Sequence, residues 1–103
     1  MVIGKMENIR EVIKRVNLRD SDDIARAKEE IKEMLTTRVE YMRDIARMCE
    51  QGAEVLISAL EQNDLRNAKD MCETIVREAN NLITKGVDLR RGLEEAEPFL
   101  EGF

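Results

Sequence analysis

The sequence predicts an all-α protein, an antiparallel helical bundle of three to four helices with one long central helix. Of its 103 residues 38% are charged, and one proline and five glycines are too few to separate many strands. Apolar residues also recur every three or four positions along most of the chain, which is the spacing of helices. The length fits a single helical domain, residues 1–103.

The first helix is expected over residues 1–16. Its apolar residues share one face because they are three or four positions apart: Met6, Ile9, Ile13 and Val16. A polar stretch, residues 17–23, follows this helix and contains Asp20, a suitable N-cap for the next one.

A long central helix is expected over residues 22–61, where the helical pattern continues without proline. One apolar stripe keeps a seven-residue repeat, interrupted only by Arg38 and Gly52: Ile24, Ala27, Ile31, Met34, Tyr41, Ile45, Met48, Val55 and Ala59. A second stripe lies beside it: Leu35, Val39, Met42, Ala46, Cys49, Ala53, Leu56 and Leu60. Two adjacent stripes are wider than one partner helix covers, so residues 35–60 are expected to pack against at least two neighbours.

The length of this helix leaves two alternatives. A helix of about 40 residues is ~60 Å long, whereas a compact domain of this size has a radius of gyration of ~13 Å. Either the helix is continuous and shares its exposed stripes with a second copy, or it breaks at Thr36-Thr37, where Thr37 and Glu40 match a capping box. The continuous helix is favoured because no glycine or proline enforces a stop there.

The third helix is expected over residues 64–85. Asn63 or Asp64 can cap its start, and Gly86 is the natural cap at its end. The connection from the central helix is short, which makes the two helices antiparallel and residues 38–85 a helical hairpin.

The last segment, residues 87–103, is expected to form a short helix and an apolar tail. Pro98 should end any helix near Ala96. The tail contains Phe99 and Phe103, two of the three aromatic residues of the chain. We expect it to pack on the bundle or on a partner; the alternative is an end without a packing role.

The residue types in this chain argue against catalysis and metal binding. Histidine is absent, which excludes imidazole bases, Ser-His and Cys-His pairs and mixed Cys/His zinc sites. Cys49 and Cys72 lack CxxC spacing and lie in apolar stripes, so they are interpreted as small buried hydrophobes. Asp and Glu side chains four residues apart lie mainly on polar helix faces. Solvent hydrates their charges there, so they are not interpreted as metal ligands. We therefore expect no enzyme, no catalytic residue, no metal site and no cofactor.

The charge balance bears on partners and location. The net charge is −5, with both signs interleaved, whereas a general nucleic-acid binder carries a basic face. No hydrophobic stretch approaches the ~20 residues that span a bilayer, and the N-terminus lacks the apolar centre of a signal peptide. We expect a cytoplasmic protein that does not insert into membranes.

The two stripes and the tail supply the expected interface. Arg38 is unusual, since it occupies a stripe position between Ile31 and Ile45. It either sets register or partner choice, or extends its charged end to solvent; both remain open. The predicted interface residues are Leu35, Arg38, Val39, Met42, Ala46, Leu56, Leu60, Phe99 and Phe103. The expected partners are a second copy, as a homodimer, and a further protein.

The hairpin resembles a known family. Residues 59–68, ALEQNDLRNA, followed by residues 75–82, IVREANNL, are similar to the helical hairpins of the PhoU-like phosphate-uptake regulators. The resemblance implies three-helix bundles, regulation of a phosphate transporter or sensor kinase, and metal clusters held by acids four residues apart. Metal binding is not carried over, because Glu73 is followed by Arg77 and Asn80 stands where an acid is expected.

The sequence therefore predicts a non-catalytic helical module for protein–protein interaction, self-associating and regulatory or adaptor in role. One alternative is a PhoU-like regulator of phosphate transport signalling. The other is a small accessory subunit of a larger enzyme or nucleic-acid complex.

Overall fold

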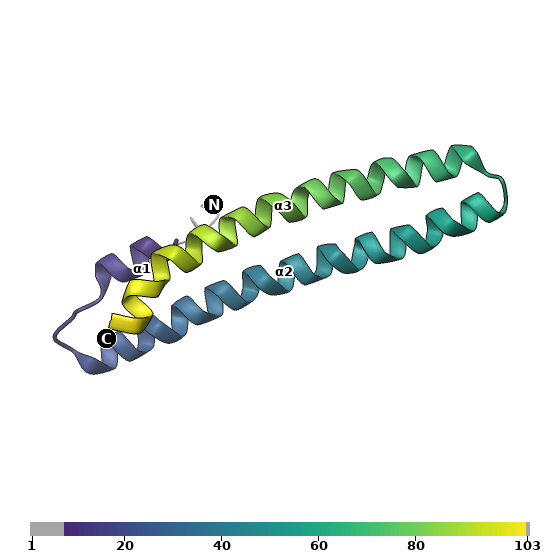
Figure 1. Ribbon diagram of the computed structural model, residues 1–103. Coiled ribbons are helices and arrows are strands. Elements are labelled where there is room, and N and C mark those ends of the chain that lie inside the picture. The colour runs from purple at the N-terminus through teal and green to yellow at the C-terminus, as the bar shows by residue number, and fades with distance from the viewer. Residues whose placement is uncertain (1–7, 103) are drawn as a thin grey trace, which may run out of the picture. The chain divides into compact units, whose positions relative to one another are not determined.

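The computed structural model describes residues 8–102 and contains three helices (Figure 1). They are α1 (Ile9–Arg15), α2 (Ser21–Glu61) and α3 (Leu65–Gly102), and the described residues contain no strand. The predicted all-α class is confirmed. Met6 and Phe103, named among the predicted packing residues, lie outside the described part of the chain.

The chain divides into two compact units, which both α2 and α3 enter. Of the described residues, the core unit comprises 8–37 and 89–102, and the hairpin unit comprises 38–88.

Side-chain caps define the first two helix starts. Asn8 caps α1, its Oδ1 accepting from the backbone N–H of Glu11 at 2.9 Å. Asp20 caps α2 as expected, its Oδ1 accepting from the N–H groups of Asp22 and Asp23 at 3.0 and 3.4 Å. These caps satisfy donors that have no partner within a helix, which fixes where each helix begins.

Helix α2 continues through Thr36-Thr37 without a break. Threonine lowers helix propensity by well under 1 kcal/mol per residue, which is less than the cost of disturbing a packed side chain nearby. Ile31 and Leu35, in the turn before this point, are 0% and 8% exposed. Their burial holds the helical register through the two threonines.

The expected ends at Gly86 and Ala96 are wrong, because α3 is one helix through both positions. Gly86 has no positive φ and is not a cap; a Cβ there would lie 3.5 Å from Cε of Met42, so it lies against α2. Pro98 lies inside the helix, where a proline costs about 3 kcal/mol. Burial of Ala96 and Phe99, 0% and 4% exposed, offsets that cost. The expected short fourth helix is therefore the last part of α3.

The turn between α2 and α3 uses both predicted capping residues, in different ways. Asn63 has φ 57°, the left-handed conformation that asparagine tolerates at a helix end. The N–H of Asp64 donates to the carbonyl of Ala59 at 2.8 Å, and its Oδ1 accepts from the N–H of Asn67 at 3.3 Å. Asn63 thus ends α2 and Asp64 caps α3.

All three helices contribute to one hydrophobic core in the core unit. Its buried members are Ile9, Val12, Ala27, Ile31, Leu35, Ala96 and Phe99. Partly buried side chains surround them: Ile13, Val16, Ile24, Met34, Leu89 and Leu100. An ion pair between Arg15 and Glu30, at 2.7 Å, links α1 to α2 at the edge of this core. Because α1 has only seven residues, this packing rather than its own propensity holds it in place.

Candidate interaction surface

In the hairpin unit α2 and α3 pack antiparallel along a narrow seam. The α2 residues facing α3 are buried or half-buried and alternate at intervals of four and three: Arg38, Met42, Ile45, Cys49, Gly52, Leu56 and Ala59. The corresponding α3 residues are Ala68, Met71, Ile75, Glu78, Leu82 and Lys85. A Cβ on Gly52 would lie 3.0 Å from Cγ1 of Ile75 and 3.3 Å from Sδ of Met71, so the helices approach closely there. This spacing is that of a coiled coil.

The α2 side of the seam lies between the two predicted stripes. Arg38, Ile45, Gly52 and Ala59 follow the first stripe, whereas Met42, Cys49 and Leu56 belong to the second. The remaining residues of the first stripe in this unit consequently lie on one side of the seam, and those of the second stripe lie on the other side.

Charged residues also occupy the seam. Lys85 extends over Tyr41, with Nζ 5.3 Å from the ring centroid, within cation–π range. Half-buried Glu78 has its Oε1 3.9 Å from Nε of Arg77. Arg38 is half-buried where α2 enters the hairpin unit. These side chains keep the seam from being a purely apolar contact.

One side of the hairpin, here called the apolar face, presents hydrophobic residues from both helices. From α2 it includes Val39, Ala46, Ala53 and Leu60, and from α3 Leu65, Cys72, Val76 and Ile83. A local two-fold axis, perpendicular to the plane of the two helices, relates the members of an antiparallel pair. Residues that directly follow a seam residue in the sequence therefore lie on the same face of the pair in both helices. All eight are exposed; Val39 is 49% exposed, Val76 54% and Ile83 65%.

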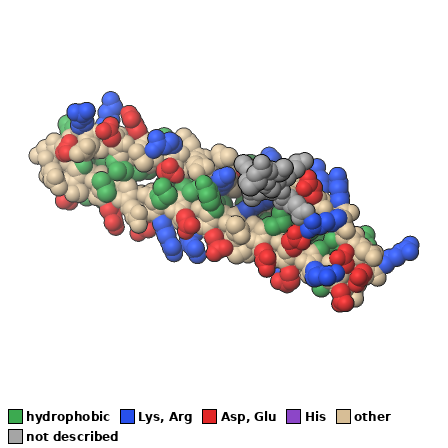
Figure 2. Space-filling model, turned by 180° about the vertical axis from the view of Figure 1, so that it is seen from behind, with side chains coloured by type: hydrophobic (Ala, Val, Ile, Leu, Met, Phe, Trp, Pro, Cys, Tyr) green, Lys and Arg blue, Asp and Glu red, His purple; other side chains and the backbone are tan. Residues whose placement is uncertain are grey.

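The opposite side, here called the mixed face, is apolar on α2 alone. Its α2 residues are Tyr41, Met48 and Val55, each about half exposed, and the α3 residues beside them are Asn67, Thr74, Asn81 and Asp88. Figure 2 shows separate patches of hydrophobic side chains across the visible face of the hairpin unit, at the left of the view, with charged groups mainly at its edges.

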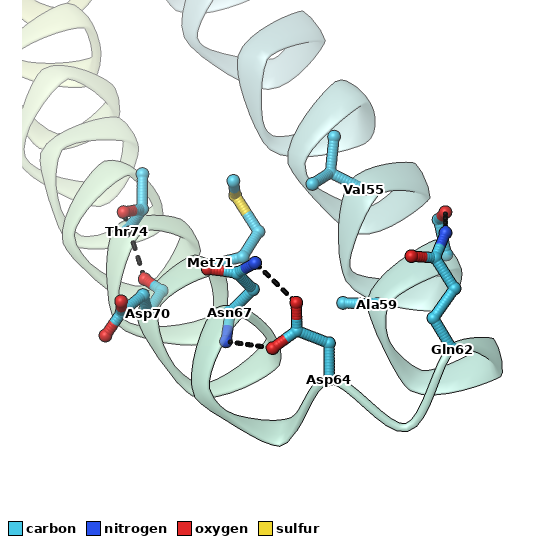
Figure 3. A pocket seen from close by; sticks show the side chains of 9 residues that line it. Val55, Ala59, Gln62, Asp64, Asn67, Asp70, Met71 and Thr74 are labelled. Carbon is cyan, nitrogen blue, oxygen red and sulfur yellow. Dashed lines mark hydrogen bonds between the residues drawn. The ribbon is translucent and has the colours of Figure 1, made fainter.

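The mixed face contains an open groove of about 390 Å³ beside the turn, lined by Val55, Ala59 and Met71 and by polar side chains (Figure 3). Nδ2 of Asn67 donates to Oδ2 of Asp64 at 2.6 Å, and the Thr74 hydroxyl donates to the carbonyl of Asp70 at 3.1 Å. These polar groups are engaged with their own chain, so the groove is a furrow between two helices rather than a set of converging ligand groups.

The charges near the turn differ between the helices. The exposed acids of α2 are Glu50, Glu54 and Glu61, whereas α3 begins with the exposed bases Arg66 and Lys69. They lie on the outward sides of the helices, at the rim of the apolar face. Exposed Asp70 and Glu73 follow these bases, so only the first turn of α3 is basic.

Two other kinds of site are absent from residues 8–102. No three Cys, Asp or Glu side chains in this range lie close enough together to hold a metal ion. Nor does any helix in the same range combine the length and apolar character needed to cross a membrane.

The structure places the predicted interface residues that it describes in three settings. Val39, Ala46 and Leu60 are exposed together on the apolar face, and Arg38, Met42 and Leu56 are half-buried in the seam. Leu35 and Phe99 are buried in the core of the chain itself, so neither side chain is offered to a partner. Phe103 lies outside the described residues.

The α3 half of the apolar face was missed by the sequence prediction. None of Leu65, Cys72, Val76 and Ile83 was among the predicted interface residues. Their intervals of seven and four give the signal that could have separated them, since they form a repeat of their own beside the seam.

No family model, curated protein or solved structure matches this chain. The resemblance of the hairpin to PhoU-like regulators stays a prediction.

Proposed function

We propose that this protein is a non-catalytic helical protein–protein interaction module that self-associates and has a regulatory or adaptor role in the cytoplasm. Its architecture in this proposal is an antiparallel bundle of three to four helices around the long central helix. The apolar face carries the proposal, because it places exposed hydrophobic residues of two helices side by side.

The size of these side chains supports an interface rather than an ordinary surface. Leu60, Leu65, Val76 and Ile83 are each 51–69% exposed. Isolated exposed hydrophobic residues are common, but a contiguous patch rimmed by charges is typical of an interaction site. Burying the exposed half of each would contribute about 1 kcal/mol per side chain.

The charge distribution supports a protein partner. The net charge is −5, and both signs alternate around the hairpin, whereas nucleic-acid binding favours a continuous basic surface. A further protein could dock on the mixed face, whose α2 side is apolar.

Solution mass tests the proposal directly. We expect size-exclusion chromatography with light scattering to give at least twice the chain mass of 11.9 kDa at micromolar concentration. The chain mass alone, unchanged up to about millimolar protein, would refute self-association.

A further inference from the structure

We infer that the apolar face binds a second copy of this chain, with the two α2–α3 turns at the same end, so that α2 of each copy covers α3 of the other. The inference rests on the proposed self-association and names the surface and arrangement that produce it. The resulting assembly of the two hairpin units is a four-helix bundle in which every neighbouring pair is antiparallel.

The available area suits a dimer. The apolar face follows α2 from residue 39 to residue 60, which corresponds to ~33 Å at 1.5 Å per residue. Two packed helices are ~20 Å wide, so the face offers ~650 Å² on each copy. The pair would bury ~1,300 Å², which is within the range of stable protein–protein interfaces.

Side-chain size makes the face complementary to itself. The middle of its α2 half has the small residues Ala46 and Ala53, whereas the α3 half has the larger Val76 and Ile83. When a second copy binds, the small α2 side chains of one chain meet the larger α3 side chains of the other, so that the two layers interdigitate.

The levels of these residues along the hairpin fix the arrangement. Gly86 lies against Met42, and Gly52 lies against Ile75. By interpolation, Ile83 is level with the turn of α2 that contains Ala46, and Val76 with the turn before Ala53. With both hairpin turns at one end, each large residue of α3 therefore meets a small residue of the second copy's α2. With turns at opposite ends, α3 would face α3, and the large side chains would oppose one another.

The rim charges favour the same arrangement. Near the turn, Glu61 of α2 would lie level with Arg66 of the second copy's α3. Opposite charges at an interface rim select orientation more than they add affinity. The reversed arrangement would place α3 on α3, which separates Arg66 from Glu61.

A matched pair of variants tests the face. Ile83→Glu introduces a charge on the apolar face, where the side chain is 65% exposed, and Met48→Glu does so on the mixed face at 53% exposure. Both positions are exposed in the single chain, so both variants should keep its helical circular dichroism. We expect Ile83→Glu to weaken dimerisation at least tenfold, measured by analytical ultracentrifugation, and Met48→Glu to change it less than threefold.

Distances between spin labels test the arrangement. Labels attached through Gln62→Cys, in a Cys49→Ala, Cys72→Ala background, mark the turn of each copy. Turns at the same end should give a distance below ~30 Å, and turns at opposite ends one above ~35 Å, set by the length of the hairpin unit. Ultracentrifugation of the background variant provides the control that it still associates.

The outcomes separate the two proposals. A wild-type dimer that resists Ile83→Glu, or that gives the long label distance, overturns this inference while self-association stands. A wild-type monomer overturns both.

Discussion

Gly52 and Gly86 lie in the interiors of the two long helices, and their surroundings predict opposite effects of the same substitution. Alanine is favoured over glycine in a helix by about 1 kcal/mol, and this gain applies at both positions. At Gly86 a new Cβ would lie 3.5 Å from the flexible end of Met42, an ordinary contact. Gly86→Ala should therefore raise the free energy of unfolding by about 1 kcal/mol.

At Gly52 the new methyl group meets a packed seam. Its Cβ would lie 3.0 Å from Cγ1 of Ile75, an atom in the middle of a β-branched side chain that has little freedom to move. Overpacking of this kind costs about 1–3 kcal/mol, which cancels or exceeds the helix-propensity gain. Gly52→Ala should leave stability unchanged or lower it by up to about 2 kcal/mol.

Thermal and urea unfolding, followed by circular dichroism at one protein concentration, measures the difference. Each kcal/mol shifts the melting temperature by about 4–8 °C for a domain of this size. The Gly86→Ala variant should therefore melt at least ~4 °C above the Gly52→Ala variant. Equal stabilisation by both substitutions would refute the close approach of α2 and α3 at Gly52.

Two further substitutions test the ends of α3. Asp64→Ala removes the acceptor for the Asn67 N–H and should destabilise the protein by about 1 kcal/mol, measured by urea unfolding; Asp64→Asn, which keeps an acceptor oxygen, should recover most of it. Pro98→Ala restores a helical N–H and should stabilise the protein by about 1–2 kcal/mol; a lower melting temperature would contradict the uninterrupted helix over this position.

The sequence predicts the long helix and the turn well, because strong local signals define both. Asp20 caps α2 through its own side chain, and the pair Asn63-Asp64 combines a residue tolerant of positive φ with a good N-cap. Gly86 and Pro98 were misjudged for one physical reason. Local propensity alone favours a helix end at each, but packing against Met42 and burial of Phe99 outweigh it.

The interaction surface could be predicted only in part, because periodicity shows which residues share a face but not what covers that face. Leu35 and Val39 belong to the same predicted stripe, yet the first is 8% exposed inside the core unit and the second 49% exposed on the hairpin. The difference arises because α1 and the last part of α3 pack beside Leu35, a tertiary arrangement that one stripe does not specify.

The hairpin unit buries little apolar surface by itself, which favours its association. Its buried hydrophobic residues are Ile45, Ala59 and Ala68, of which two are alanines. Small side chains let α2 and α3 approach closely, but they bury little apolar area, and two helices alone offer few other positions for a core. Further hydrophobic side chains, Val76 and Ile83 among them, lie exposed outside the seam. A second layer of helices over the apolar face would supply the burial that the seam lacks, so stability of this unit should rise with protein concentration.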